Sequence, residues 1–214
     1  MRPLFALLLL VLLGAASPAD RPSFDCAAAS NLTEMAICGD PELAAWDRAV
    51  ARLYRSQRNA GDIKPSDQRQ WLSRRDECGR DRTCLAKIYR SWSGFELNAQ
   101  GFGTLYRRNG TQPRDPASLE VLPITGGWIY FSVTALHVQV APGGVNDGQA
   151  WGLVQMHKGL ATFNPEPNRD FTCRFYLRQS GLGLSIEEFG KATRCGGLNV
   201  SLSGFYTRMP GKRR

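Results

Sequence analysis

Six cysteines are the residues of this 214-residue chain whose type and spacing suggest chemistry most directly. Zinc binding is one use of cysteine, but zinc sites usually space their ligands closely, as in Cys-x-x-Cys. Eleven residues separate Cys26 from Cys38, five separate Cys78 from Cys84, and both histidines lie far downstream. We therefore expect no metal site and no cofactor, and we expect the cysteines to form disulfides. The six positions are Cys26, Cys38, Cys78, Cys84, Cys173 and Cys195.

Two histidines and one pair of adjacent glutamates are the candidates for catalysis. His137 and His157 have no nucleophile motif such as Gly-x-Ser-x-Gly nearby, so a structural role is the simpler interpretation of each. Glu187 and Glu188 are expected on a strand, where neighbouring side chains point to opposite faces. The two carboxyl groups therefore cannot both face one glycosidase cleft. We predict no catalytic residue and a protein that is not an enzyme.

The first nineteen residues have the layout of a secretory signal peptide. A basic residue precedes an unbroken apolar run, Leu4 to Leu13, and small residues follow it. The run is shorter than the roughly 20 residues of a membrane-spanning helix. Cleavage after Ala16 or Ala19 fits the small-residue rule, and Cys26 does not follow the small residues that lipidation requires. We expect a periplasmic or secreted protein that does not span the membrane, with three disulfides.

Between residues 20 and 98 the apolar residues recur at helical spacing. Asn31, Asp40 and Asp81 each stand where a helix N-cap is expected, and Pro41 suits a first helical position. In the longest pattern, apolar residues form one stripe and the arginines lie largely away from it. The stripe consists of Leu43, Trp46, Val50, Leu53 and Tyr54, and the arginines are Arg48, Arg52, Arg55 and Arg58. The pattern predicts a small helical bundle with a core of about a dozen apolar side chains, a size that usually needs disulfides.

The pairing of the first four cysteines stays open, because four cysteines allow three connectivities. We favour Cys26–Cys38 with Cys78–Cys84, since each bridge would close a short loop across one helix junction. The nested alternative joins Cys26 to Cys84 and Cys38 to Cys78, which would tie the ends of the bundle together.

A series of short motifs links these four cysteines. They are Phe24-Asp25-Cys26, Glu34-x-x-Ile37-Cys38, Asp40-Pro41-Glu42-Leu43-Ala44, Asp47, Leu53-Tyr54, Gln68-x-x-Trp71-Leu72, Arg75-Asp76-x-Cys78 and Cys84-Leu85. Over residues 24 to 97 the series resembles the N-terminal domain of the LprI-type lysozyme inhibitors. The resemblance implies an exported, disulfide-bonded helical domain with a lysozyme as its partner. The founding member of that family is a lipoprotein, whereas this chain lacks the lipidation cysteine.

Asp47 and Arg75 lie at the edges of the predicted apolar stripes. They could contact a partner protein, or they could form an ion pair that holds two helices together. We favour the ion pair, which is costly to break if it is buried.

From residue 99 to residue 210 the pattern changes to short β-type runs between turn residues. About eight strands at this spacing indicate an antiparallel barrel or sandwich, so the fold class is α+β. The predicted strands cover residues 104–108, 119–122, 128–140, 150–156, 160–163, 171–177, 184–188 and 198–206. Cys173 and Cys195 are expected to form the third disulfide. Residues 211–214 form a basic tail.

The first and last predicted strands end alike, in Tyr106-Arg107-Arg108 and Tyr206-Thr207-Arg208. Strands with such endings could lie side by side and close a barrel. Tyrosine beside arginine also makes a flat contact surface, so we predict Tyr106, Arg108, Tyr206 and Arg208 as binding residues. Ordinary strand composition is the simpler interpretation, because tyrosine has high β propensity.

The net positive charge of the chain lies mainly in its second half. Residues 20 to 98 carry 13 basic and 12 acidic side chains, and residues 99 to 214 carry 13 and 7. A basic surface is suited to an anionic lipid, polysaccharide or acidic protein. It would not attract an animal-type lysozyme, which is commonly basic. We expect a lysozyme inhibitor or, alternatively, an envelope-binding or adaptor protein. Nucleic acid is not an expected partner of an exported chain.

Overall fold

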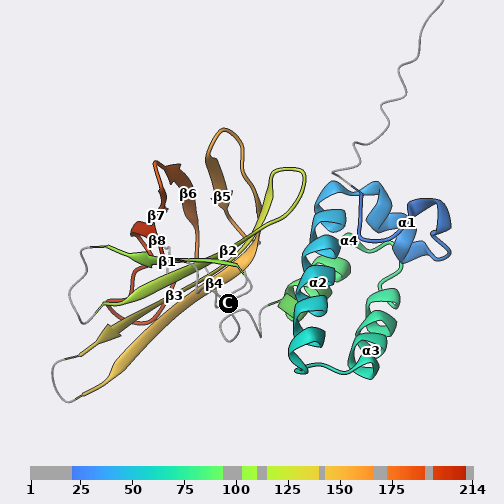
Figure 1. Ribbon diagram of the computed structural model, residues 1–214, viewed down its shortest axis with the longest axis horizontal. Helices are drawn as coiled ribbons and strands as arrows, with labels where there is room; N and C mark the ends of the chain where they lie inside the picture. Colours follow the sequence, from blue (N-terminus) through green and yellow to red (C-terminus); the bar gives the residue numbers. More distant parts are fainter. Residues whose placement is uncertain are drawn as a thin grey trace, which may run out of the picture.

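The computed structural model describes residues 21–93, 103–109, 115–139, 143–165, 173–190 and 195–210. Within them, four α-helices precede an eight-stranded antiparallel sheet (Figure 1). The helices are α1 (Leu32–Gly39), α2 (Pro41–Ala60), α3 (Pro65–Asp76) and α4 (Arg82–Ser93), with a short 3-10 turn at Cys26–Ala28. The strands are β1 (Thr104–Arg108), β2 (Ala117–Pro123), β3 (Trp128–Val138), β4 (Val145–Gln155), β5 (Leu160–Phe163), β6 (Phe175–Ser180), β7 (Gly183–Glu188) and β8 (Gly204–Arg208). The predicted α+β class is confirmed, while the signal peptide and the basic tail lie outside the described residues.

The helices begin where the sequence predicts. The Asn31 side chain accepts a hydrogen bond from the Glu34 N–H at 2.8 Å, and Asp40 accepts from the Glu42 and Leu43 N–H groups. Asp81 caps α4 in the same way through the Thr83 and Cys84 N–H groups. These carboxylate and amide oxygens satisfy N–H groups that have no partner inside a helix.

Three disulfides join the six cysteines, and the described residues contain no free thiol. The pairs are Cys26–Cys38, Cys78–Cys84 and Cys173–Cys195. The favoured short-range pairing of the helical cysteines is confirmed and the nested alternative is excluded. Three disulfides indicate an extracytoplasmic protein. Within the described part, none of the helices is apolar and long enough to cross a bilayer.

The eight strands form a barrel in which chain neighbours are also neighbours in the sheet, except for β4 and β5. The strand order is β4-β3-β2-β1-β8-β7-β6-β5, so the pairing of β1 with β8 joins the two halves. Tyr106 lies opposite Arg208, and Arg108 lies opposite Tyr206. The predicted contact between the first and last strands is therefore confirmed. Among the described strands, β4 and β5 stand at the two ends of this order and form no ladder with each other, so the barrel is nearly closed. The isolated bridge between His157 and Leu160 lies in the turn that joins them.

Three strand predictions are wrong in their limits by three or more residues. β6 runs on to Ser180 rather than ending at residue 177. β4 begins at Val145 rather than at residue 150, because β3 pairs with it as far as Val138 opposite Val145. Gly148 in this strand lets the Cys195 segment approach closely, because a Cβ at position 148 would lie 2.6 Å from the Cys195 carbonyl oxygen. The last strand begins at Gly204 rather than at residue 198, since Asn199 has a φ of 64° and turns the chain.

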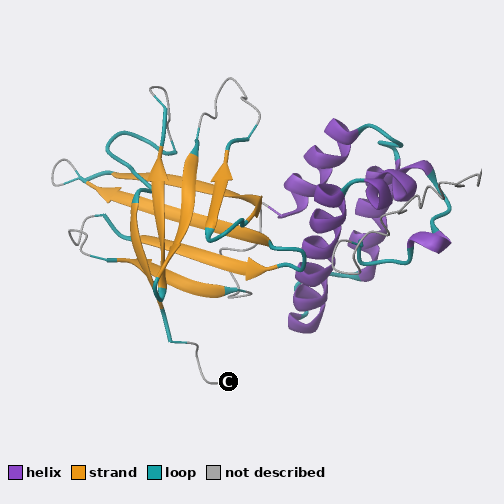
Figure 2. Cartoon of the chain, turned by 90° about the horizontal axis from the view of Figure 1, so that it is seen from above, coloured by secondary structure: helices purple, strands orange, loops and turns teal. Residues whose placement is uncertain are grey.

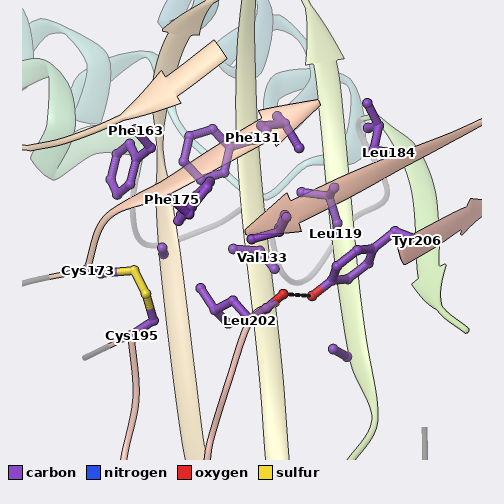
Figure 3. Packing of buried hydrophobic residues seen from close by; sticks show 14 of the residues in the cluster. Leu119, Phe131, Val133, Phe163, Cys173, Phe175, Leu184, Cys195, Leu202 and Tyr206 are labelled. Atoms are coloured by element: carbon purple, nitrogen blue, oxygen red, sulfur yellow. Dashed lines mark hydrogen bonds between the residues drawn. A yellow bond between two sulfur atoms is a disulfide. The ribbon is translucent and has the colours of Figure 1, made fainter. Parts of the chain in front are cut away.

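Apolar side chains gather in two clusters, one inside the barrel and one between the helices and the sheet. Figure 3 shows the barrel cluster, where Phe131, Phe163 and Phe175 pack edge to face or tilted with ring centres 5.0 to 5.4 Å apart. The second cluster combines the helical core with outward-facing sheet residues. These sheet residues are Leu122, Ile124, Tyr130 and Leu153. The helices thus cover one outer face of the barrel, beside β2, β3 and β4, and lie together at one side of it in Figure 2.

Candidate functional site

The four predicted binding residues lie together on one face of the β1–β8 pair. Residues directly opposite each other in an antiparallel pair share a face. That face is the inside of the barrel: Tyr206 is fully buried, and Tyr106 packs against the barrel core. The Tyr206 hydroxyl donates to the Leu202 carbonyl at 2.6 Å (Figure 3), and burial raises the pKa of this hydroxyl. Tyr206 is therefore not available to a partner, which corrects the expectation of an exposed tyrosine–arginine surface.

Arg108 closes one end of the barrel. Its guanidinium donates to the carbonyl oxygens of Ser201, Ser203 and Asp115. These bonds hold two loops to the end of β1, so the side chain has a structural role. Arg208 is exposed, and it is the member of the predicted set that a partner could reach.

Both histidines and Glu188 also have protein partners. His137 Nδ1 lies 2.6 Å from an Asp115 carboxylate oxygen, and His157 Nε2 lies 2.9 Å from Gln155 Oε1. The Glu188 carboxylate accepts from the Leu202 and Ser203 N–H groups and so holds the loop before β8. Among the described residues, no three histidine, cysteine or carboxylate side chains are grouped as metal ligands.

A buried polar network holds the helical bundle together. Asp47 on α2 is 5% exposed; one of its carboxylate oxygens accepts from the Tyr89 hydroxyl at 3.0 Å, and the other from the Ser23 N–H at 2.7 Å. An Arg75 guanidinium nitrogen lies 3.7 Å from Asp47. The network therefore ties the N-terminal segment, α2, α3 and α4 to one carboxylate. The ion pair favoured from the sequence is present and buried.

The protonation of this network follows from burial and charge. Burial, reinforced by the Asp47 charge, raises the pKa of the Tyr89 hydroxyl. Burial alone would lower the pKa of Arg75, but the acidic groups Tyr89, Asp76 and Asp47 around it raise that pKa instead. Arg75 therefore remains a cation, and its guanidinium also lies 5.9 Å from the centre of the Trp71 ring.

The helical unit exposes two large apolar side chains, both on α1. Leu32 is 54% exposed and Met35 is 47% exposed, and one helical turn separates them. All other large apolar residues found exposed in the described part belong to the barrel. An exposed apolar pair is suited to contact with another protein, because burial of apolar surface is the main favourable term in most protein association.

Two grooves open along the junction between the helices and the barrel. The larger, about 520 Å³, follows the incomplete β4–β5 closure and includes Glu42, Arg90, Trp128 and Phe163 in its walls. The smaller, about 340 Å³, is the arginine groove, lined by Arg21, Arg48, Arg52 and Arg55 with parts of the β2–β3 turn.

The sequence did not predict these grooves, because each joins residues that lie far apart along the chain. A signal for the arginine groove was present in the i, i+4, i+7 spacing of Arg48, Arg52 and Arg55. That spacing places all three on one face of α2. Comparison of the chain with protein-family models, curated proteins and solved structures gives no match.

Proposed function

We propose that this chain is an exported binding protein, not an enzyme, and that its helical unit inhibits a lysozyme in the manner of the LprI-type inhibitors. The observation that carries the proposal is the structural role of the residues that resemble the LprI-type domain. Cys26, Cys38, Cys78 and Cys84 form two disulfides, and Asp47 and Arg75 meet in the buried network. Asp40 caps α2, and Ile37, Trp71 and Leu85 are buried. The resembling residues therefore form one connected framework, which leaves the exposed residues to select the partner.

Leu32 and Met35 are the exposed residues of this unit best suited to bind a protein. Interfaces depend on a few well-packed apolar or aromatic anchors surrounded by polar contacts. These two side chains lie on the helix that carries Cys38, whose disulfide holds it to the segment before it. The disulfide constrains the backbone that carries the pair, which reduces the conformational entropy that this segment loses on binding.

A cell-wall lysis assay tests the proposal. The full-length mature protein is added to animal-type, goose-type and phage-type lysozymes, and lysis is followed by turbidity. We expect inhibition of at least one class, weakened about tenfold or more by a Leu32→Ser, Met35→Ser double variant. Leu182→Ser, on the barrel at 92% exposure, is the matched control and should inhibit normally. Full activity of every lysozyme with excess protein would reject the proposal.

Envelope binding is the second candidate, favoured by exposed arginines on the barrel. Arg107, Arg178 and Arg208 are all exposed, on β1, β6 and β8. In this alternative the barrel contacts an anionic lipid, polysaccharide or acidic protein. Retention on isolated envelope material should then weaken as salt rises past about 0.15 M, where the screening length is about 8 Å. Retention that does not change with salt would contradict it.

A further inference from the structure

The arginine groove is built by three separate segments of the chain. Residues 21–23 form one wall, α2 forms the second, and the β2–β3 turn forms the third. Its lining consists of Arg21, Pro22, Ser23, Arg48, Arg52, Arg55, Pro123, Ile124 and Thr125. Four of these nine residues are arginines and none is acidic. The groove therefore concentrates positive charge in one concave surface, although the helical region as a whole is close to neutral.

Two of the arginines donate to backbone carbonyl oxygens. Arg48 donates to the Thr125 carbonyl at 3.1 Å and to the Arg21 carbonyl, and Arg52 donates to the Pro123 carbonyl at 2.7 Å. Carbonyl oxygens orient a guanidinium without neutralising its charge. Arg52 and Arg55 make no ion pair with any residue that the structure describes. Their positive charge therefore remains available at the mouth of the groove.

This arrangement differs from the other buried or clustered arginines of the molecule. Arg75 faces Asp47 and Asp76, and Arg82 faces Asp40 and Glu42, so the charge of each is matched inside the protein. Arg108 donates to carbonyls, but these bonds hold the loops at the barrel end. In the groove on α2, by contrast, carbonyls orient Arg48 and Arg52, and Arg21 and Arg55 line the same volume.

We propose that the arginine groove binds a phosphate group carried by an anionic ligand. Guanidinium groups bind oxyanions through paired, charge-assisted hydrogen bonds. A carboxylate offers two oxygens in one plane, whereas a phosphate offers three or four in different directions. Arginines on separate walls fit the second geometry. The volume of about 340 Å³ suits a small phosphorylated group, such as a lipid headgroup or a soluble phosphate ester. This site is separate from the lysozyme contact proposed on α1.

Calorimetric titration of the full-length protein tests the site. The probes are inorganic phosphate, glycerol 3-phosphate, and vesicles of phosphatidylcholine alone or mixed equally with phosphatidylglycerol. The test variant is Arg52→Gln, Arg55→Gln. The matched control is Arg69→Gln, Arg74→Gln, which removes the same charge from two exposed positions on α3. A melting curve for each variant checks that it is folded, and Arg55→Gln alone, which leaves the Arg52 bond to Pro123 in place, provides a milder second variant.

We expect the Arg52→Gln, Arg55→Gln variant to lose phosphate affinity by about tenfold or more, because hydrogen bonds to charged groups contribute most to such sites. The α3 control should bind nearly as the natural chain does. Arg55→Gln alone should fall between the two double variants, since it removes one guanidinium group and leaves Arg52 in place. Binding of glycerol 3-phosphate without vesicles indicates a soluble ligand, and binding of the anionic vesicles indicates a lipid headgroup. Equal losses in the two double variants, or no binding of any probe by the natural chain, would overturn the site. Lysozyme inhibition should be unchanged by Arg52→Gln, Arg55→Gln, so the two proposals can fail independently.

Discussion

The barrel and the helical unit bury their apolar side chains in different ways. The barrel cluster is made from barrel residues alone, centred on Leu119, Phe131 and Phe175. The helical cluster is completed by residues of the sheet, and Trp46 of α2 meets Tyr130 of β3 edge to face with ring centres 5.9 Å apart. The comparison indicates that the barrel has a core of its own, whereas the helices depend on the outer face of the barrel.

The same strands contribute side chains to both apolar clusters, because their side chains point alternately into the barrel and out of it. On β2, Leu119 points into the barrel and Leu122 points towards the helices, and on β3 Phe131 and Tyr130 divide in the same way. Consecutive side chains of a strand point to opposite faces. Truncating an apolar side chain inside the barrel should therefore destabilise the helices as well. Truncating one that faces the helices should leave the barrel intact.

The largest expected effect comes from Asp47→Ala in the helical unit. The change leaves the Tyr89 hydroxyl buried without its acceptor and removes the buried carboxylate that lies 3.7 Å from Arg75, which keeps only its bonds to Asp76. Removing one partner of a buried ion pair typically costs about 3–5 kcal/mol. We expect the free energy of unfolding, measured in urea, to fall by that amount and the helical amides to exchange first. Glu77→Gln, an exposed carboxylate on the same unit, should change it by less than about 0.5 kcal/mol. Equal costs for the two substitutions would show that the network does not hold the helices together.

The next effect compares Leu119→Ala with Leu122→Ala, the same truncation on two faces of one strand. Both side chains are buried, with exposed fractions of 0% and 3%, and each change should cost about 2–5 kcal/mol. Hydrogen exchange followed by mass spectrometry shows which elements each truncation destabilises. Leu122→Ala should speed exchange in α2 and α4 only, and Leu119→Ala should speed exchange in the barrel and in the helices. Faster exchange in the barrel strands after Leu122→Ala would contradict the one-way dependence.

The sequence predicts local features of both regions well and contacts between them poorly. The caps at Asn31, Asp40 and Asp81 depend on residues two or three positions away, and all three were predicted. The disulfides within the bundle also join nearby residues, which is why the short-range pairing was favoured. The burial of Tyr206 depends on which face of β8 closes the barrel. The alternation of side chains along the strand does not reveal that choice, because its two faces carry Tyr206 and Phe205.

The same limit applies to the helix–barrel junction. Leu122 and Tyr130 lie in predicted strands, and nothing local to them indicates that helices ending at Ala60 and Ser93 cover their outer face. The helical core was therefore predicted as small and self-contained. The arginine groove was missed for the same reason, since its third wall is the β2–β3 turn.

A smaller effect is expected at alkaline pH, with one tyrosine reporting on each region. Burial raises the pKa of Tyr89 in the helical unit and of Tyr206 in the barrel, above the usual value of about 10. Below that pH both states keep the proton, so stability is unaffected. Above it the unfolded chain releases the proton and the folded chain keeps it, so each tyrosine lowers the free energy of unfolding by about 1.4 kcal/mol per pH unit.

Denaturant unfolding between pH 9 and pH 12 measures this slope. Tyr89→Phe and Tyr206→Phe should each make it less steep, although each loses a hydrogen bond worth about 1 kcal/mol at neutral pH. Absorbance titration of the folded protein that finds every tyrosine ionising at the usual pH would contradict the prediction.

The smallest effect is expected for Arg82→Gln, which breaks an ion pair at the surface of the same helical unit. Arg82 donates to Asp40 at 2.7 Å and also to Glu42, but its side chain is 54% exposed, against 6% for Arg75. Burial would raise the pKa of Asp40, yet hydrogen bonds from the Leu43 N–H and from Arg82 outweigh it and hold that pKa below its usual value. Exposed ion pairs contribute about 0–1 kcal/mol and are screened by salt. We expect Arg82→Gln to lower the free energy of unfolding by less than about 1 kcal/mol, with the difference shrinking in 1 M salt. A loss as large as that of Asp47→Ala would show that the α1–α2–α4 contact, and not the buried network, limits the stability of the helices.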